Sequence, residues 1–131
     1  LLLPGATLVI LDQRNRIDAL LEPEVFAPAP GQGALGLLVR EDDDLAFELA
    51  YTLQHRPSFD RIRAERAFAA ALPDRRVGAL ATVSEEGEMT LFGAVATDGT
   101  SLQAQVSGDA GEAEQLGNEL AQDVQEQLAA L

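Results

Sequence analysis

The sequence predicts an α+β fold, in which an open-faced, three-stranded antiparallel sheet is covered by helices and preceded by a partial α/β segment. In several segments the apolar residues recur at steps of three and four, which is the period of a helix. Between residues 77 and 106 they instead form short strand-like runs separated by glycine-containing turns. The 131 residues are 47% hydrophobic, which is enough for one core.

The first 41 residues are expected to hold pieces of α/β structure. Residues 8–11 form a short apolar run that could be a buried strand, and the Pro-rich residues 27–31 interrupt any regular element. In residues 33–40, leucine and valine alternate with small or apolar neighbours, which predicts a strand covered on both faces. The Pro-rich stretch is the best candidate for a domain boundary.

Two helices are expected next. Leucines recur every four residues from Leu45 to Leu53, directly after the acidic run 41–44. Aspartates in such a run can cap a helix, and their charge suits its positive N-terminal end. Ser58 is a suitable N-cap for a second helix, which runs to Leu72 and stops at the following proline.

Three antiparallel strands and a last helix complete the expected domain. The strands are residues 77–83, 89–97 and 101–106. Gly87 lies in the first turn and Asp98-Gly99 in the second, and Asp-Gly is a strong hairpin signal because glycine accepts a positive φ. Asp109 and Glu112 then form a start similar to a capping box, followed by one apolar helix face to the end of the chain.

Composition excludes several classes of function. The chain has 22 acidic and 9 basic residues, a net charge of −13, which argues against binding to nucleic acid phosphates. It has no cysteine, so disulfides, zinc-thiolate sites and a thiol nucleophile are excluded. No apolar run approaches the ~20 residues of a membrane span, and the first residues lack the features of a signal peptide. A cytoplasmic protein is expected, and the absence of an initiator methionine suggests a fragment or a processed chain.

Residues 31–36 match the pattern G-x-G-x-x-G. In a dinucleotide site these glycines let a strand-to-helix turn approach a pyrophosphate. Here a Pro-rich coil precedes the glycines and a strand-like segment follows them. The pattern is therefore interpreted as a tight turn that leads into a packed strand.

Other polar features fit local structure better than catalysis. His55, the single histidine, has Ser58 and Asp60 nearby, but capping of a helix start explains both, and His55 is expected at the surface or as a C-cap. The aspartates at 42–44 lack the spacing of a calcium loop, so helix capping is favoured over a cation site. Solvated loop charge is favoured over a carboxylate-binding role for Arg75-Arg76. No catalytic residue and no metal site is expected.

Glu65 and Arg66 interrupt the apolar face of the second expected helix. Two interpretations stay open for these residues: a structural ion pair within the domain, or a contact to another domain.

Two segments together resemble a known family. Residues 28–36 (PAPGQGALG), followed by residues 65–68 (ERAF), look like the C-terminal part of porphobilinogen deaminase, also called hydroxymethylbilane synthase. The resemblance continues through Gly78-Ala79, the Asp98-Gly99 hairpin and Leu116-Gly117. It covers about residues 16–131, whereas residues 1–13 match poorly.

The resemblance implies a domain organisation and site residues. Members of this family have three domains, so residues 1–41 would be a remnant of domain two together with the strand that returns to domain one. Residues 42–131 would be the C-terminal α+β domain. Gln32 and Gly33 match the family's glutamine-glycine near the cofactor, and Glu65 and Arg66 match the helix pair that holds domain three against the rest.

The resemblance also implies a chemistry. The family, a group of transferases, joins porphobilinogen units head to tail into hydroxymethylbilane for tetrapyrroles such as heme. It uses a dipyrromethane cofactor held by a thioether to a cysteine in the loop after the ERAF helix. Here the corresponding residues 72–79 are fewer and contain no cysteine, so no covalent cofactor is expected and this chain alone is expected to be inactive.

Three interpretations of the chain follow. It is a fragment or cofactor-less relative whose partners are missing N-terminal domains or a second copy of itself. Alternatively, it is a non-catalytic protein-interaction or regulatory module. The third is a piece of a split enzyme that an upstream chain completes, with the tetrapyrrole held non-covalently.

Overall fold

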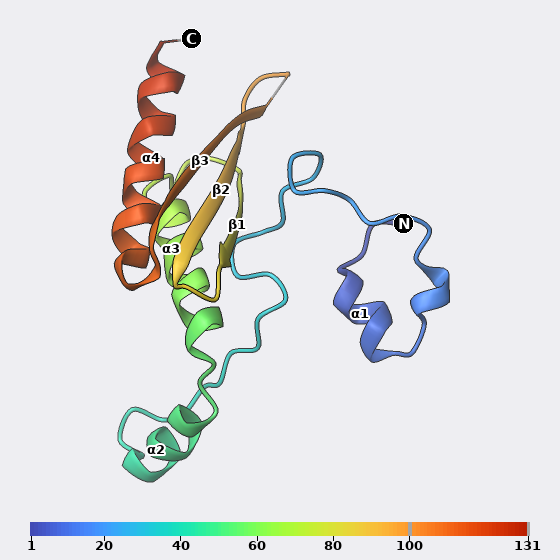
Figure 1. Cartoon of the computed structure of the whole chain (residues 1–131), viewed down its shortest axis with the longest axis vertical. Coiled ribbons are helices and arrows are strands. Elements are labelled where there is room, and N and C mark those ends of the chain that lie inside the picture. The colour runs from blue at the N-terminus through green and yellow to red at the C-terminus, as the bar shows by residue number, and fades with distance from the viewer. Residues whose placement is uncertain (100, 131) are drawn as a thin grey trace.

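The structure, a computed structural model, describes residues 1–99 and 101–130 and has a sheet with two long helices on one side (Figure 1). The elements in chain order are α1 (Gly5–Ile10), the 3₁₀ turn η1 (Arg14–Arg16), α2 (Asp44–Thr52), α3 (Arg56–Ala70), β1 (Val77–Val83), β2 (Glu88–Ala96), β3 (Ser101–Asp109), the 3₁₀ turn η2 (Ala110–Glu112) and α4 (Ala113–Ala129). The three strands form one antiparallel sheet in the order β1-β2-β3. The predicted α+β fold class is confirmed.

The core lies between the sheet and the pair of helices α3 and α4. Its largest fully buried side chains are Phe68, Met89, Leu91, Val95, Leu120 and Val124. Each such side chain stabilises the fold by about 1.5–3 kcal/mol relative to an exposed one. The two helices cross closely because position 117 is glycine, where a Cβ would lie 2.4 Å from the carbonyl oxygen of Ala64. We call α3, the sheet, η2 and α4 the sheet domain.

The hairpins and most of the helix starts follow the predicted turn and cap residues. Gly87 and Gly99 have φ angles of 86° and 93° in the two hairpin turns, which are values that favour glycine. Asp43 caps α2 by accepting a hydrogen bond from the backbone N–H of Ala46 at 2.9 Å. Asp109 accepts one from Gly111 at 2.6 Å and leads through η2 into α4.

The start of α3 differs from the prediction. The N-cap is His55 and not Ser58, and α3 ends at Ala70. The imidazole Nδ1 of His55 lies 2.9 Å from the Ser58 hydroxyl and 3.4 Å from its N–H. Because Pro57 has no N–H to satisfy, it fits the first turn and moves the helix start upstream of Ser58. His55 is an exposed capping residue, as expected of a surface histidine, but it caps the start of a helix and not the end.

Both strands predicted upstream of the sheet domain are wrong. The apolar run 8–11 lies largely in α1, because so short a run does not distinguish a helix from a strand. Residues 33–40 form no strand, and Leu38 in their middle is fully exposed. A strand needs a neighbour to accept its hydrogen bonds, and no described strand lies beside this segment.

Helix α2 lies away from the sheet, beyond the first turn of α3 (Figure 1). It contributes no buried residue, and its Phe47 and Leu49 are 61% and 60% exposed. The packed core of this chain therefore begins at α3.

Candidate functional site

Glu65 joins three parts of the chain. It lies in the middle of α3 and is only 6% exposed. One carboxylate oxygen, Oε2, accepts a hydrogen bond from the backbone N–H of Gly31 at 2.6 Å, and Oε1 accepts one from Ala81 in β1 at 2.8 Å. Hydrogen bonds to an ionised acceptor are stronger than neutral ones. The carboxylate thus ties the Gly31 turn to α3 and to the outer edge of β1.

Arg66 has a different environment from its neighbour. It is exposed, and within the described chain it forms no hydrogen bond or ion pair. Adjacent helix residues do not face each other, so Glu65 and Arg66 cannot pair readily. The structural ion pair that we considered is absent among the described residues, where backbone amides occupy the Glu65 carboxylate and no acidic group pairs with Arg66. The guanidinium of Arg66 borders a large cleft instead.

Gln32 and Gly33 lie in the turn that Glu65 holds. The Gln32 side chain folds back, and its Oε1 accepts a hydrogen bond from the N–H of Ala29 at 3.1 Å. Gly31 and Gly33 have φ angles of 76° and 85°, so both positions favour glycine. The tight turn is confirmed. No helix follows it directly, so a helix N-terminus for a dinucleotide pyrophosphate is lacking here.

A cleft of about 1240 Å³ separates residues 33–39 from α2 and α3. Its apolar lining includes Leu35, Leu37, Phe47, Tyr51, Leu53, Phe59 and Ile62. At its α3 side, Arg66 provides a positive charge, whereas the charge of Arg63 is offset by Glu114, which also lines the cleft. Such a surface can bind an apolar segment of another protein or domain that carries acidic groups at its border.

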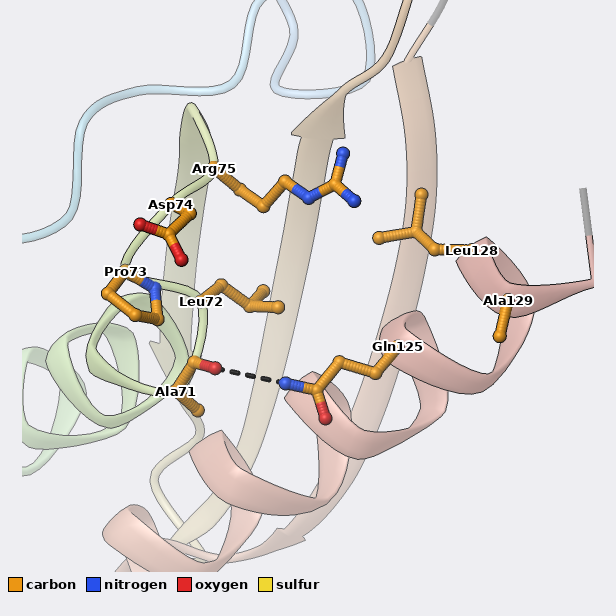
Figure 2. A pocket seen from close by; sticks show the side chains of 8 residues that line it. All are labelled: Ala71, Leu72, Pro73, Asp74, Arg75, Gln125, Leu128 and Ala129. Atoms are coloured by element: carbon orange, nitrogen blue, oxygen red, sulfur yellow. Dashed lines mark hydrogen bonds between the residues drawn. The ribbon is translucent and has the colours of Figure 1, made fainter.

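A smaller pocket of about 330 Å³ lies beside the loop between α3 and β1 (Figure 2). Leu72 and Leu128 provide apolar walls, and the Gln125 side-chain amide donates to the carbonyl of Ala71 at 3.0 Å. The loop contributes Asp74 and Arg75, both exposed. This pocket offers a carboxylate, a guanidinium and an amide to a ligand, but no sulfur atom.

Asp60 is a buried charge that the sequence interpretation did not identify. It is 5% exposed; its Oδ2 lies 2.6 Å from Arg56 Nε, and its Oδ1 lies 3.8 Å from Arg63 Nη1. The hydrogen bond to Asp60 raises the pKa of Arg56. Arg63 also pairs with Glu114 of α4 at 3.2 Å. The explanation of Asp60 as a capping residue is wrong. Arg56 lies four residues before it and Arg63 three residues after it, and this helical spacing could have indicated the ion pairs.

The described residues hold no group of three or more His, Asp or Glu side chains placed to bind a metal ion. Among the described helices, none combines the length and the apolar composition needed to cross a membrane.

Comparison with known proteins gives consistent results. Residues 1–48 match the profile of a family described as "Porphobilinogen deaminase, dipyromethane cofactor binding domain". Porphobilinogen deaminase of Thermus thermophilus is 54% identical over 132 residues, which cover 97% of this chain and 44% of the relative. The corresponding proteins of Deinococcus radiodurans and Synechococcus elongatus are 44% and 39% identical, over 99% and 98% of this chain and 43% and 42% of their own length. The chain thus spans less than half the length of these relatives and matches their C-terminal part.

Proposed function

Because this chain belongs to the porphobilinogen deaminase family and matches the C-terminal part of its members, we propose that it is the C-terminal portion of a tetrapyrrole-biosynthesis protein. The reaction of such a protein is the polymerisation of porphobilinogen to hydroxymethylbilane. The identity of 54% over nearly the whole chain is the observation that carries this proposal.

We further propose that this chain does not catalyse the reaction by itself. A thioether to dipyrromethane requires a cysteine sulfur, and the sequence has none. The residues of the α3–β1 loop, Pro73 to Arg76, offer a carboxylate and guanidinium groups instead. The residues present therefore do not fit a covalently held dipyrromethane.

The test is to incubate the purified chain with porphobilinogen and to follow substrate consumption, colour with Ehrlich's reagent and intact mass. We expect no consumption, no colour and an unchanged mass of 13.9 kDa. The Thermus thermophilus relative, treated in parallel, is the positive control. An Ehrlich-positive protein with increased mass would refute the proposed inactivity, but it would leave the family assignment intact.

We propose that Glu65 and Arg66 form the contact with the upstream domains and that Gln32 and Gly33 border the cofactor region. Two observations support this assignment. The Glu65 carboxylate fixes the Gly31 turn, from which Gln32 and Gly33 extend to an exposed position. Arg66 faces the apolar cleft, where a partner's carboxylate would find an unpaired cation.

A second candidate function is a non-catalytic interaction module. Exposed apolar residues in and beside the cleft favour it, since Leu35, which lines the cleft, is 96% exposed and the nearby Leu38 is fully exposed. Surfaces of this kind are typical of binding sites or of association between copies. In this case the partner is a second copy or another protein, and not upstream domains of the same chain.

Self-association can be measured by light scattering after size-exclusion chromatography. We expect the isolated chain to form dimers as its concentration rises, and more readily at high salt, because salt screens the repulsion between chains of net charge −13. The double variant Leu38→Ser/Phe47→Ser should stay monomeric. A native chain that is monomeric at millimolar concentration in high salt would count against the interaction module.

A further inference from the structure

The sheet has an open face, turned away from α3 and α4. Gly93, on the other face, points at the helices, since a Cβ there would meet the Phe68 ring at 2.7 Å. The neighbouring row of paired residues, which therefore lies on the open face, is Gly78, Ala94 and Gln103. Residues 24–31 of the same chain, which we call the strap, meet this row.

Both ends of the row contact the strap. On β3, the side-chain amide of Gln103 donates to the carbonyl of Glu24 at 2.7 Å. On β1, a Cβ at Gly78 would lie 2.5 Å from the Cβ of Ala27 and 3.0 Å from its carbonyl oxygen, so only glycine lets the strap approach this closely. Ala94, between them, is 9% exposed although it lies outside the core cluster on the helix side. The strap therefore crosses the strands from β3 to β1.

Beyond this row, the strap continues along the free edge of β1, where Figure 1 shows the trace meeting the sheet. The carbonyl of Pro28 accepts a hydrogen bond from Ala79 at 2.9 Å, and the N–H of Gly31 donates to Glu65. The edge amide of Ala79 is thereby satisfied. Pro28 and Pro30 have no N–H that the contact would leave unpaired, and proline loses little conformational entropy on ordering.

We propose that the open face of the sheet is a binding surface for a proline-containing segment, and that residues 24–31 occupy it in cis. The strap and the sheet domain then move as one body, and the points of bending lie before Glu24 and after Gly31. Gln103 and Gly78 position the strap on this surface, Gln103 through its hydrogen bond to Glu24 and Gly78 through its close approach to Ala27. The inference rests on contacts within this chain and does not depend on its proposed function.

Residue-resolved hydrogen exchange of the full chain tests the strap. The Ala79 amide is the reporter, because it is protected by the Pro28 carbonyl. Gln103→Ala removes the side-chain hydrogen bond to the Glu24 carbonyl. It should speed exchange at Ala79 by roughly five-fold, which is the effect of one lost hydrogen bond. Gln105→Ala is the matched control on the same strand and face, because Gln105 makes no hydrogen bond to the strap in the described chain. It should leave the rate unchanged.

A second pair of variants tests the close approach. Gly78→Ala should speed exchange at Ala79 by about ten-fold, because its methyl group displaces Ala27. Gly36→Ala is its control, since a Cβ there meets nothing within 4 Å. Exchange at Leu91, in the core, should change in none of these variants.

Three results would overturn the proposal. The first is an Ala79 rate that neither Gln103→Ala nor Gly78→Ala changes. The second is equal effects of Gln103→Ala and Gln105→Ala. The third is protection of the Ala79 amide that grows with protein concentration, since a segment of a second copy would then occupy the open face of the sheet. If Gly78→Ala does not fold, the comparison of the two glutamine variants still decides.

Discussion

Replacing Glu65 with alanine should lower the free energy of unfolding by about 3 kcal/mol, because two backbone amides would lose a charged acceptor. The N–H groups of Gly31 and Ala81 would both lack their partner, and that of Ala81 is buried. The Gly31 turn would also lose its hydrogen bond to α3. Urea denaturation followed by circular dichroism measures the change.

Two further variants separate the contribution of Glu65 from that of an ordinary surface charge. Glu65→Gln should cost about 2 kcal/mol, since its amide group keeps one acceptor oxygen and turns a second donor toward a backbone N–H. Glu114→Ala removes an exposed carboxylate whose ion pair in the described structure is with Arg63, and it should cost under ~1 kcal/mol. Equal free energies of unfolding for Glu65→Ala and Glu114→Ala would contradict this role, in which the Glu65 carboxylate links the Gly31 turn to β1.

The elements predicted correctly are those whose signal is local. The final helix repeats apolar residues such as Leu116, Leu120 and Val124 every three or four positions, and all three are buried. The hairpin turns need glycine at a positive φ, and Gly87 and Gly99 meet this need. Short-range chemistry of this kind is visible in the sequence without knowledge of the neighbours.

The failures concern features that depend on distant partners. Glu65 and Gly31 are 34 residues apart, and no local pattern indicates that a carboxylate in a helix will accept from that turn. The resemblance identified Glu65 as a contact residue, but its backbone partners came only from the structure. Residues 33–40 have the alternation of a strand, yet a strand forms only beside another one, and none of the described strands lies there. The strap was missed for the same reason.

The boundary of the C-terminal domain stays a prediction. The resemblance places the C-terminal domain at residues 42–131, which would include α2. In the structure, α2 has no buried residue, and the core begins with α3. The stretch that includes residues 33–39 and α2 exposes apolar side chains along the cleft, as expected of a segment that packs on a partner.

Two phenylalanines of α3 test where the core ends. Phe68 is fully buried against the sheet, and Phe68→Ala should lower the free energy of unfolding by about 4 kcal/mol, from lost burial and a cavity. Phe59, in the first turns of the same helix, is 44% exposed and lines the cleft. The matched variant Phe59→Ala should therefore cost under ~1 kcal/mol in the isolated chain.

Denaturation of both variants at low protein concentration gives the comparison. A large loss for Phe59→Ala would mean that the first turns of α3 are packed in this chain, and it would contradict a core that stops short of the cleft. A small loss for Phe59→Ala that becomes large when a partner or upstream domains are present would identify the cleft as the surface that they cover. Phe68→Ala should cost the same in both states, because its ring is fully buried in the core of the sheet domain.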